Sequence, residues 1–495
     1  MTELKTADKT AGLKTGNKLE FNCELKKLAI FLVIVAIGWL MPALGSITTI
    51  GVRVLFVFIA IVYGWSASSE IWPSLLAVLL LPFTGAITFP QLIGSGWGTD
   101  VGLFMIMLFV LLRFLEEQGV SQYLTAWLLS RRFLQGHPWR FLFMLFLAAY
   151  LVASLIHIFV GVYLVWGIVY SLVNALGYKP FDKFPTVLIF GVVLMGALSL
   201  SAMPWGANSI VLLAFFTNML GNGVDIGKYL IYTLPLGLVS IMTYLLMCKF
   251  IFRLDVSALK NMDGDFINTE DLKLTTAKKI ALGALAAFII ILLTPTLLPK
   301  TWAVTESLSS MGYTGKIIPI FVVLAMIRVD HKPIFSFVQL AAKGVNWRMM
   351  GILIVVLPLG VCLNNEATGL AAFLSQSLLP IFNGMSPLAF LVGITVVTIV
   401  LTNFLANMPV AMLLMPVAVN GAASYGINPE QIGYLLIVAC TLAWMTPAAS
   451  PAGMLLFSNK EWLCPKDIFK FGIPTMICIA IIILLVNYFW LGLFY

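Results

Sequence analysis

A single histidine lies inside one of the most apolar stretches of the sequence. The run ASLIHIFVGVYLVW covers residues 153–166, and His157 is its only side chain that titrates near neutral pH. With a reference pKa of about 6.5, an imidazole can donate a hydrogen bond to an anion, accept one from a protonated group, or carry a proton. A lone histidine on an apolar face is more often a core residue, so its surroundings must decide which role applies.

A second apolar run, LTNFLANMPVAMLLMPVAV at residues 401–419, contains polar residues and a proline near its start. Polar side chains and proline are costly in lipid, so we expect this stretch to face protein or water. It therefore predicts a re-entrant hairpin in place of a plain membrane crossing. The residues that distinguish it are Thr402, Asn403, Asn407 and Pro409.

Two further apolar runs are interrupted by proline, glycine and small polar residues. Proline removes an amide donor, and such a break leaves carbonyl groups and helix ends free inside the membrane. Carbonyl oxygens suit a hard cation such as sodium, and helix N-termini suit a carboxylate. The alternative is a kinked packing helix whose serines and asparagines make interhelical contacts. The interrupting residues are Pro204, Gly206, Asn208 and Ser209 in the first run, and Pro447, Ser450, Pro451 and Gly453 in the second.

The composition places all of these runs in a membrane. Of the 495 residues, 61% are apolar and 10% are charged, and the mean hydropathy is +1.03. A helix needs about 20 mostly apolar residues to cross a bilayer, and such runs recur from residue 28 to the C-terminus. The sequence thus predicts an all-α integral membrane protein. The net charge of +8 is explained by basic residues beside the spans, so no nucleic-acid partner is expected.

Charge placement also predicts the orientation. Residues 1–27 are polar and lysine-rich, and they are expected to form a disordered cytosolic tail without a secretory signal. Lysines precede the last span and no base follows it, so this span should run from the cytosol outward. We expect a multi-pass protein of the cytoplasmic (inner) membrane, with the N-terminus inside and the C-terminus outside. The mixed-charge stretch 254–277 is interpreted as a cytosolic linker.

The linker separates two halves, 28–253 and 278–495, that share an internal repeat. A constant offset of 250 residues pairs Trp97 with Trp347, Glu116 with Glu366, Gly119 with Gly369 and His157 with Asn407. Interrupted spans at matching positions of two repeats are typical of secondary transporters, whose sites form where the repeats meet. Arg113 lies three residues before Glu116, which predicts a local ion pair.

The chain resembles the divalent anion/sodium symporter family within the wider ion transporter superfamily. That family carries a Ser-Asn-Thr motif at the tip of each of two hairpins, and a proline nine residues after each asparagine. ANMPVAMLLMP keeps this spacing with Asn407 and Pro416, MTPAASPAGMLLF resembles the second broken helix, and residues 96–120 resemble the helix before the first hairpin. The resemblance covers most of the chain from about residue 30.

What the resemblance implies is specific. It implies an inverted structural repeat, about 11 transmembrane helices plus two re-entrant hairpins, and an elevator-type homodimer. The hairpins would cover residues 139–173 and 386–421, and the broken helices residues 186–217 and 430–458. The activity would be transport of a small organic anion of the carboxylate class, by cation symport or by exchange.

The motifs also depart from the family pattern. Their triplets read Ile156, His157 and Ile158 at the first tip, and Ala406, Asn407 and Met408 at the second. Val152 stands where the second half has Thr402, so the first cation site has lost its oxygens. Apolar residues replace both threonines that would meet a carboxylate. This disfavours a small dicarboxylate and favours a more apolar, aromatic or monoanionic substrate, with imidazolium replacing one sodium.

These arguments define the candidate site. A single sodium site is predicted at Thr402, Asn407 and Ala449, with no other cofactor. The predicted substrate-binding residues are His157, Ile158, Trp205, Gly206, Asn208, Ser209, Asn407, Met408, Pro409, Ser450 and Pro451.

Two alternatives remain open. An inorganic ion antiporter or oxyanion transporter of the same superfamily would keep the fold, but no aspartate pair is evident in the hairpins or breaks. A membrane-embedded enzyme needs positioned acids, bases or metal ligands. The three histidines, His137, His157 and His331, lie far apart, and no hydrolase, zinc or nucleotide motif occurs, so an enzyme is disfavoured. Sodium or proton coupling, substrate identity and direction stay open.

Overall fold

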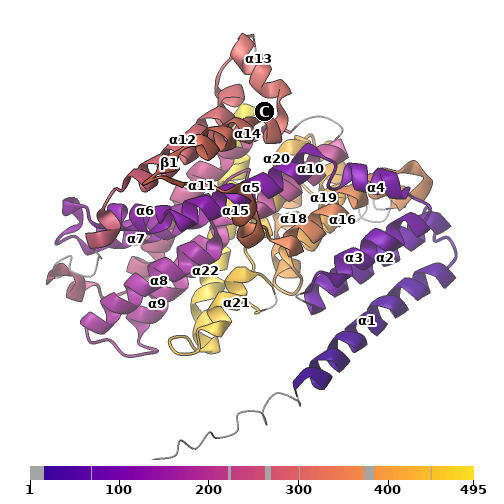
Figure 1. The fold of residues 1–495 in the computed structure, drawn as a ribbon. Coiled ribbons are helices and arrows are strands. Elements are labelled where there is room, and N and C mark those ends of the chain that lie inside the picture. Colours follow the sequence, from indigo (N-terminus) through magenta and orange to yellow (C-terminus); the bar gives the residue numbers. More distant parts are fainter. Residues whose placement is uncertain are drawn as a thin grey trace, which may run out of the picture.

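The computed structural model describes residues 16–68, 70–220, 224–261, 269–299, 301–370, 372–373, 384–447 and 449–495 (Figure 1). Within these ranges the chain is almost entirely helical. One small antiparallel ribbon joins β1 (Arg328–Val329) to β2 (Lys332–Pro333). Long apolar helices are what the bilayer requires, because a helix satisfies every backbone polar group within itself.

The first half contains α1 to α11. Their bounds are α1 Gly16–Leu40, α2 Thr49–Ala67, α3 Trp72–Phe83, α4 Phe89–Ser95, α5 Asp100–Glu117, α6 Val120–Leu129, α7 Pro138–Leu155, α8 Ile158–Ala175, α9 Lys183–Ser199, α10 Ala207–Leu220 and α11 Ile226–Leu246.

The second half contains helices from α12 to α22. Its helices are α12 Thr276–Leu297, α13 Ala303–Ser310, α14 Gly312–Met326, α15 Phe337–Gly344, α16 Trp347–Asn364, α18 Pro387–Thr402, α19 Asn407–Ser424, α20 Pro429–Ala439, α21 Pro451–Ser458 and α22 Pro465–Leu485. The pair α4 and α5, bent by 49°, corresponds to α15 and α16, bent by 80°. Later in each half a helix (α9 or α20), an unwound segment and another helix (α10 or α21) follow one another.

The described helices fit a membrane. Six are long and apolar enough to cross it, and up to nine spans result if each of three bent pairs counts as one. Only 28% of the window in α12 and 22% of that in α22 is buried inside the protein, so apolar side chains of these helices face outward, as lipid contact requires. An all-α membrane protein is therefore confirmed, whereas the number of 11 crossings, the inversion of the repeat and the elevator motion stay predictions.

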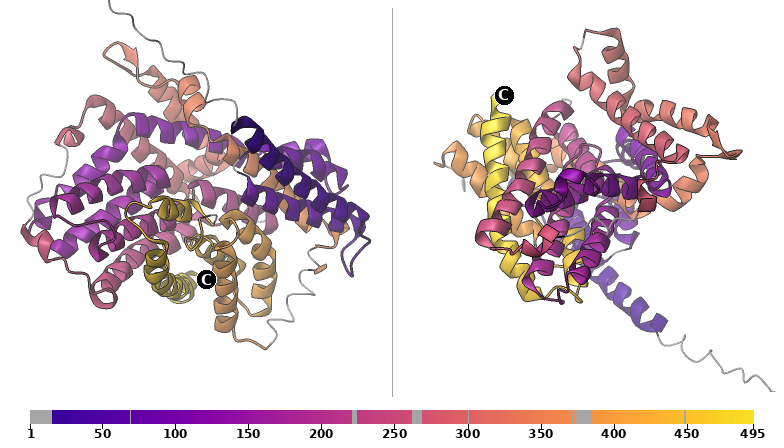
Figure 2. Two further views of the ribbon diagram at one scale, coloured as in Figure 1. Left: turned by 90° about the horizontal axis from the view of Figure 1, so that it is seen from below. Right: turned by 90° about the vertical axis from the view of Figure 1, so that its left-hand side faces the viewer.

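Two helix pairs carry the sequence features of interest. α7 ends at Leu155 and α8 begins at Ile158, and the two helices are packed so closely that a Cβ on Gly161 would lie 2.7 Å from the amide nitrogen of Ala153. In the second half, α18 ends at Thr402 and α19 begins at Asn407. Figures 1 and 2 show α7, α8 and α9 side by side at one end of the molecule and α1, α2 and α3 at the other.

Polar contacts between the halves fix the helices that surround these pairs. The indole nitrogen of Trp97 donates to the carbonyl of Met350 at 2.8 Å. The guanidinium of Arg348 donates to the carbonyl of Ser68 at 3.0 Å, at the end of α2. Asp100 begins α5 and also caps α14, because its carboxylate accepts from the amides of Tyr313 at 2.5 Å and Thr314 at 2.9 Å. Carboxylates at a helix N-terminus satisfy free amides and complement the helix dipole.

Replacing Asp100 with alanine should weaken the contact between α5 and α14. We expect Asp100→Ala to lower the free energy of unfolding by about 1–2 kcal/mol, the usual cost of a lost helix cap. Thermal unfolding of the purified protein in detergent measures this as a lower apparent Tm. Glu306→Ala, at an exposed position in α13, is the control. An equal effect of the two substitutions would contradict the capping role.

Candidate functional site

The first helix pair meets at His157, which caps α8. Its Nδ1 accepts a hydrogen bond from the amide of Phe159 at 3.3 Å, so the neutral ring carries its hydrogen on Nε2. The ring also stacks on Phe159, with centroids 5.4 Å apart. Ile156 and Ile158, on either side, are buried while His157 is half-exposed. The first tip thus offers one polar donor in an apolar setting, together with the N-terminus of α8.

The charged group that acts on His157 comes from another helix. Glu116, near the end of α5, interacts electrostatically with the imidazole. Its carboxylate also pairs with Arg113 at 3.0 Å, which confirms the predicted local ion pair. Arg113 further contacts Glu117 at 3.1 Å, and Lys343 of α15 lies 3.8 Å from Glu117. Glu116 therefore belongs to a small network of both charge signs on α5 and α15.

The second tip is built around Asn407, which is only 5% exposed. The amide is assigned with its nitrogen facing three oxygens: the carbonyl of Ala449 at 3.1 Å, the hydroxyl of Thr402 at 3.1 Å and the carbonyl of Cys440 at 3.3 Å. The Thr402 hydroxyl in turn donates to the Cys440 carbonyl at 2.7 Å. The structure thus brings together Thr402, Asn407 and Ala449, the residues of the predicted sodium site.

Asn403 is a central residue of this region that the sequence analysis did not assign to the site. Its amide nitrogen donates to the carbonyls of Ile399 and Leu442, each at 2.8 Å. Its amide oxygen accepts from the backbone nitrogens of Trp444 at 3.1 Å and Met445 at 2.9 Å. Asn403 therefore supplies the hydrogen bonds that the unwound chain after α20 lacks. The available sequence signal was a polar residue in an apolar run, four residues before Asn407.

The unwound segment continues into the start of α21. The hydroxyl of Ser450 bonds the carbonyl of Ala443 and accepts from the amides of Ala452 at 3.1 Å and Gly453 at 3.2 Å. Pro451 occupies the first turn of α21, where a missing amide hydrogen costs little. Ser450 and Pro451 thus act as a helix start in the structure.

The first unwound segment, residues 200–206, is held in a different way. The hydroxyl of Tyr229 donates to the carbonyl of Ser201 at 2.6 Å, and that of Thr233 donates to the carbonyl of Ala202 at 2.7 Å. Ser209 donates back to the carbonyl of Leu200 at 3.1 Å. Two of these three donors lie on α11, so the first break is stabilised mainly by α11 and the second by the α18–α19 tip.

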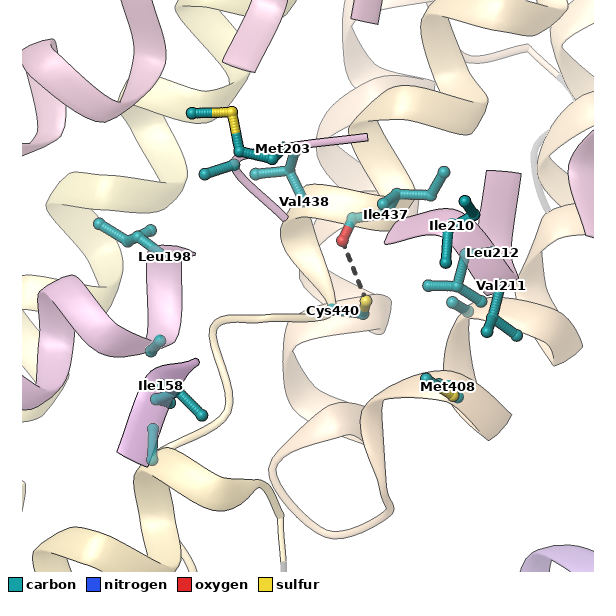
Figure 3. Close-up of a cluster of buried hydrophobic side chains, with 14 of the residues drawn as sticks. Ile158, Leu198, Met203, Ile210, Val211, Leu212, Met408, Ile437, Val438 and Cys440 are labelled. Atoms are coloured by element: carbon teal, nitrogen blue, oxygen red, sulfur yellow. Dashed lines mark hydrogen bonds between the residues drawn. The ribbon is translucent and has the colours of Figure 1, made fainter. Parts of the chain in front are cut away.

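The remaining predicted substrate residues do not converge on one cavity. Trp205 is 4% exposed and packs edge-on against Phe288 of α12 at 5.7 Å. Gly206 makes a tight turn in which a Cβ would lie 3.1 Å from the Met203 carbonyl, and Asn208 is half-buried on α10. Ile158 and Met408 belong to one buried apolar cluster, on opposite sides of Cys440 (Figure 3). Pro409 is buried in the first turn of α19.

A cavity lies beside the first unwound segment, apart from these residues. It measures about 260 Å³ and is lined by residues of α5, α10, α11, α14 and α16, among them Thr99, Pro204, Asn218 and Tyr313. None of the predicted substrate residues lines it, although Pro204 is the neighbour of Trp205. This cavity therefore lies apart from the predicted substrate residues.

Comparisons with known proteins agree with this helical architecture. A family model described as citrate transporter matches residues 54–439. The sodium-dependent dicarboxylate transporter SdcS of Staphylococcus aureus strain RF122 is 24% identical over 432 residues, which cover 84% of this chain and 81% of that protein. SdcS of Staphylococcus saprophyticus is 22% identical over 435 residues, with the same coverage. The solved YdaH transporter of Alcanivorax borkumensis aligns with a TM-score of 0.57 and 13% identity, covering 82% of this chain and 88% of that one.

Other matches are partial. The uncharacterized transporter YfbS of Escherichia coli is 27% identical over 147 residues, which are 30% of this chain and 24% of that protein. This chain also covers only 17% of a sodium-dependent dicarboxylate transporter of Caenorhabditis elegans. The family match and the long alignments nevertheless confirm the expected resemblance to anion transporters, and they favour a transporter over a membrane-embedded enzyme.

The role of Asn403 can be tested by truncation. We expect Asn403→Ala to lower the free energy of unfolding by about 2–4 kcal/mol, because it leaves two buried backbone amides without an acceptor. The measurement is the apparent Tm of the purified protein in detergent. Asn218→Ala, at an exposed asparagine of α10, should change stability by less than about 0.5 kcal/mol. Equal unfolding of the two variants would show that Asn403 does not stabilise the break.

Proposed function

This chain belongs to the citrate transporter family, and we propose that it is a secondary active transporter that moves a small organic anion of the carboxylate class across the cytoplasmic membrane. Cation symport or exchange drives it, since the sequence contains no nucleotide-binding motif. The observation that carries this proposal is the pair of tips at His157 and Asn407, where two helices begin beside unwound backbone. Helix starts attract anions, and free carbonyl oxygens attract cations.

Sodium is the coupling ion in this proposal. Two relatives that align along most of the chain are sodium-dependent dicarboxylate transporters by name. The Thr402 hydroxyl and the carbonyls of Cys440 and Ala449 supply oxygens around one point of the second tip. In the structure the Asn407 side-chain nitrogen faces these oxygens. Sodium binding would therefore require the amide to turn and present its oxygen, because a cation is repelled by the amide hydrogens.

At the first tip, His157 takes the role of an anion-binding donor. Its Nε2 hydrogen is available to a carboxylate, since Nδ1 already accepts from Phe159. Protonating Nδ1 would add a positive charge but would also remove that cap from α8, because a protonated nitrogen cannot accept. Anion binding and helix capping are thereby coupled in one side chain.

The substrate is more apolar than a small dicarboxylate. Ile158 and Met408 flank the two tips with apolar groups, and neither offers a hydroxyl to a second carboxylate. Of the predicted residues, His157 and Asn208 remain as side-chain donors to one carboxylate, since the Asn407 nitrogen already faces three protein oxygens. A monoanion with an aliphatic or aromatic body would match this set. An inorganic ion or an oxyanion is the second candidate, and no specific contact of the described residues favours it.

The larger assembly follows the family expectation. We take α7–α8 and α18–α19 to be re-entrant hairpins of two inverted repeats that move as an elevator in a homodimer, with residues 1–27 in the cytosol and the C-terminus outside. The lipid bilayer is then the main partner besides the substrate. Cysteine labelling of residues near each terminus, from either side of sealed vesicles, would test this orientation directly.

Transport itself can be measured in proteoliposomes. The purified protein is reconstituted, and the uptake of radiolabelled citrate, succinate and benzoate is followed with an inward gradient of sodium or of potassium. We expect uptake of an organic anion that depends on a gradient or on anion loaded inside. Uptake of benzoate but not succinate would support the apolar monoanion, and the reverse result would restore a dicarboxylate.

Replacing His157 tests the first tip. We expect His157→Ala to abolish uptake or remove its pH dependence while the protein still folds, because the only ionisable donor of that tip is lost. His137→Ala is the matched control, since His137 is exposed before α7. Equal uptake by the His157 variant and wild type at every pH would disprove the role.

Replacing Thr402 tests the ion site. Thr402→Val keeps the side-chain shape but removes the hydroxyl that faces Asn407 and Cys440. We expect a weaker apparent affinity for sodium in the uptake assay, by about tenfold or more, which equals about 1.4 kcal/mol. Thr395→Val, a buried threonine of α18 that bonds only within its own helix, is the control. An unchanged sodium dependence would place the ion elsewhere.

A further inference from the structure

A small cavity lies between α7, the end of α9 and α11, and none of its lining residues belongs to the predicted sodium or substrate sites. It measures about 10 Å³, which is enough for one water molecule or one small cation. Apolar residues from α9, α11 and α20 close part of its wall. Four hydroxyl-bearing side chains also line it: Tyr150, Ser201, Thr233 and Ser240.

Ser240 is the residue that requires an occupant. Its side chain is fully buried, at 0% exposure, and among the described residues its hydroxyl has no hydrogen-bond partner. A buried polar group without a partner costs about 1–3 kcal/mol. A bound species at the cavity would remove this cost, because Ser240 lines the same space.

Two of the other hydroxyls present oxygens more readily than hydrogens. Thr233 uses its hydrogen on the carbonyl of Ala202 at 2.7 Å, and Ser201 donates, more weakly, to the carbonyl of Leu198 at 3.4 Å. Each of these oxygens therefore has lone pairs left. α9 ends at Ser199, so the negative end of its dipole and its last carbonyl groups lie at the same place.

Glycine at position 237 makes room for the fourth oxygen. A Cβ there would lie 2.2 Å from the Tyr150 hydroxyl, far inside contact distance, so no larger residue fits without moving the phenol. The Tyr150 ring comes from α7 and Gly237 from α11. The cavity consequently joins α7, α11 and the first unwound segment through oxygen atoms.

We propose that this cavity binds one dehydrated monovalent cation, with sodium as the preferred ion. Oxygen acceptors from three elements and a helix C-terminus favour a positive charge, and neutral hydroxyl and carbonyl ligands suit an alkali ion. Binding would fix the first unwound segment to α7 and α11. The site shares no residue with the second-tip ion site and does not depend on the transported substrate.

The test is ion-dependent stability of the full chain in detergent. The apparent Tm is measured during titration with sodium chloride at constant ionic strength, with choline chloride as the balancing salt and potassium chloride as a comparison. An ion that binds the folded state alone raises Tm with concentration. We expect the wild type to show a sodium-specific rise, and Ser240→Ala to lose part of it. Thr186→Val is the matched control, since among the described residues its hydroxyl is also buried and without a partner, but it lines neither of the two cavities above.

A second background separates the two ion sites. In Thr402→Val the rise that remains should be removed by adding Ser240→Ala, whereas loss of the whole rise in Thr402→Val alone would overturn the proposal. An undiminished rise in Ser240→Ala would also overturn it and leave water as the occupant. If Ser240→Ala does not fold, Ser240→Cys replaces the hard oxygen by a soft sulfur at similar size. If Ser240→Cys keeps the full sodium-specific rise in Tm of the wild type, the proposal is also overturned. These measurements do not require transport, so a failure of the proposed function would not affect them.

Discussion

Every broken helix in a membrane must find partners for its freed backbone groups, and this constraint governs the centre of the molecule. After α20 the described residues 440–447 and 449–450 are unwound, and side chains of the α18–α19 tip bond this stretch. Asn403 alone binds two carbonyls and two amides. Thr446 adds a bond to the carbonyl of Asn403 at 2.6 Å. The tip and the break thus form one unit, and neither could shift without exposing unpaired backbone.

The two halves meet this constraint with different residues. In the first half, Tyr229 and Thr233 of α11 bond the break, and Ala153 stands where the repeat offset would put the counterpart of Asn403. Among the described residues, no side chain of the first tip bonds the first break. His157 is therefore left with its Nε2 hydrogen available, while Asn407 is committed to three oxygens. The second tip is held by three bonds of its asparagine, and the first keeps one side-chain donor without a protein acceptor among the described residues.

Much of the architecture was accessible from the sequence. Apolar runs, helix-breaking residues and the repeat offset predicted where helices pair and where they unwind. These features could be read from the sequence because the length of an apolar run and the presence of a proline determine helix boundaries locally. Helix ends at Leu155 and Thr402 fall close to the predicted tips. The role of Asn403 was not accessible, since its four partners include residues about 40 positions away. The position of Trp205 against Phe288 likewise depends on how α12 packs.

The sequence by itself predicted a helical membrane protein that resembles the divalent anion/sodium symporter family, with two interrupted segments and a histidine where that family places an asparagine. The local sequence suffices to predict helices here, because in lipid the backbone N–H and C=O groups must form hydrogen bonds within the protein. Only the tertiary structure decided which oxygens meet. It brought Thr402, Asn407 and Ala449 together, and it gathered Tyr150, Ser201, Thr233 and Ser240 around one small cavity. Such convergence depends on how helices distant in sequence pack, and no short pattern encodes it.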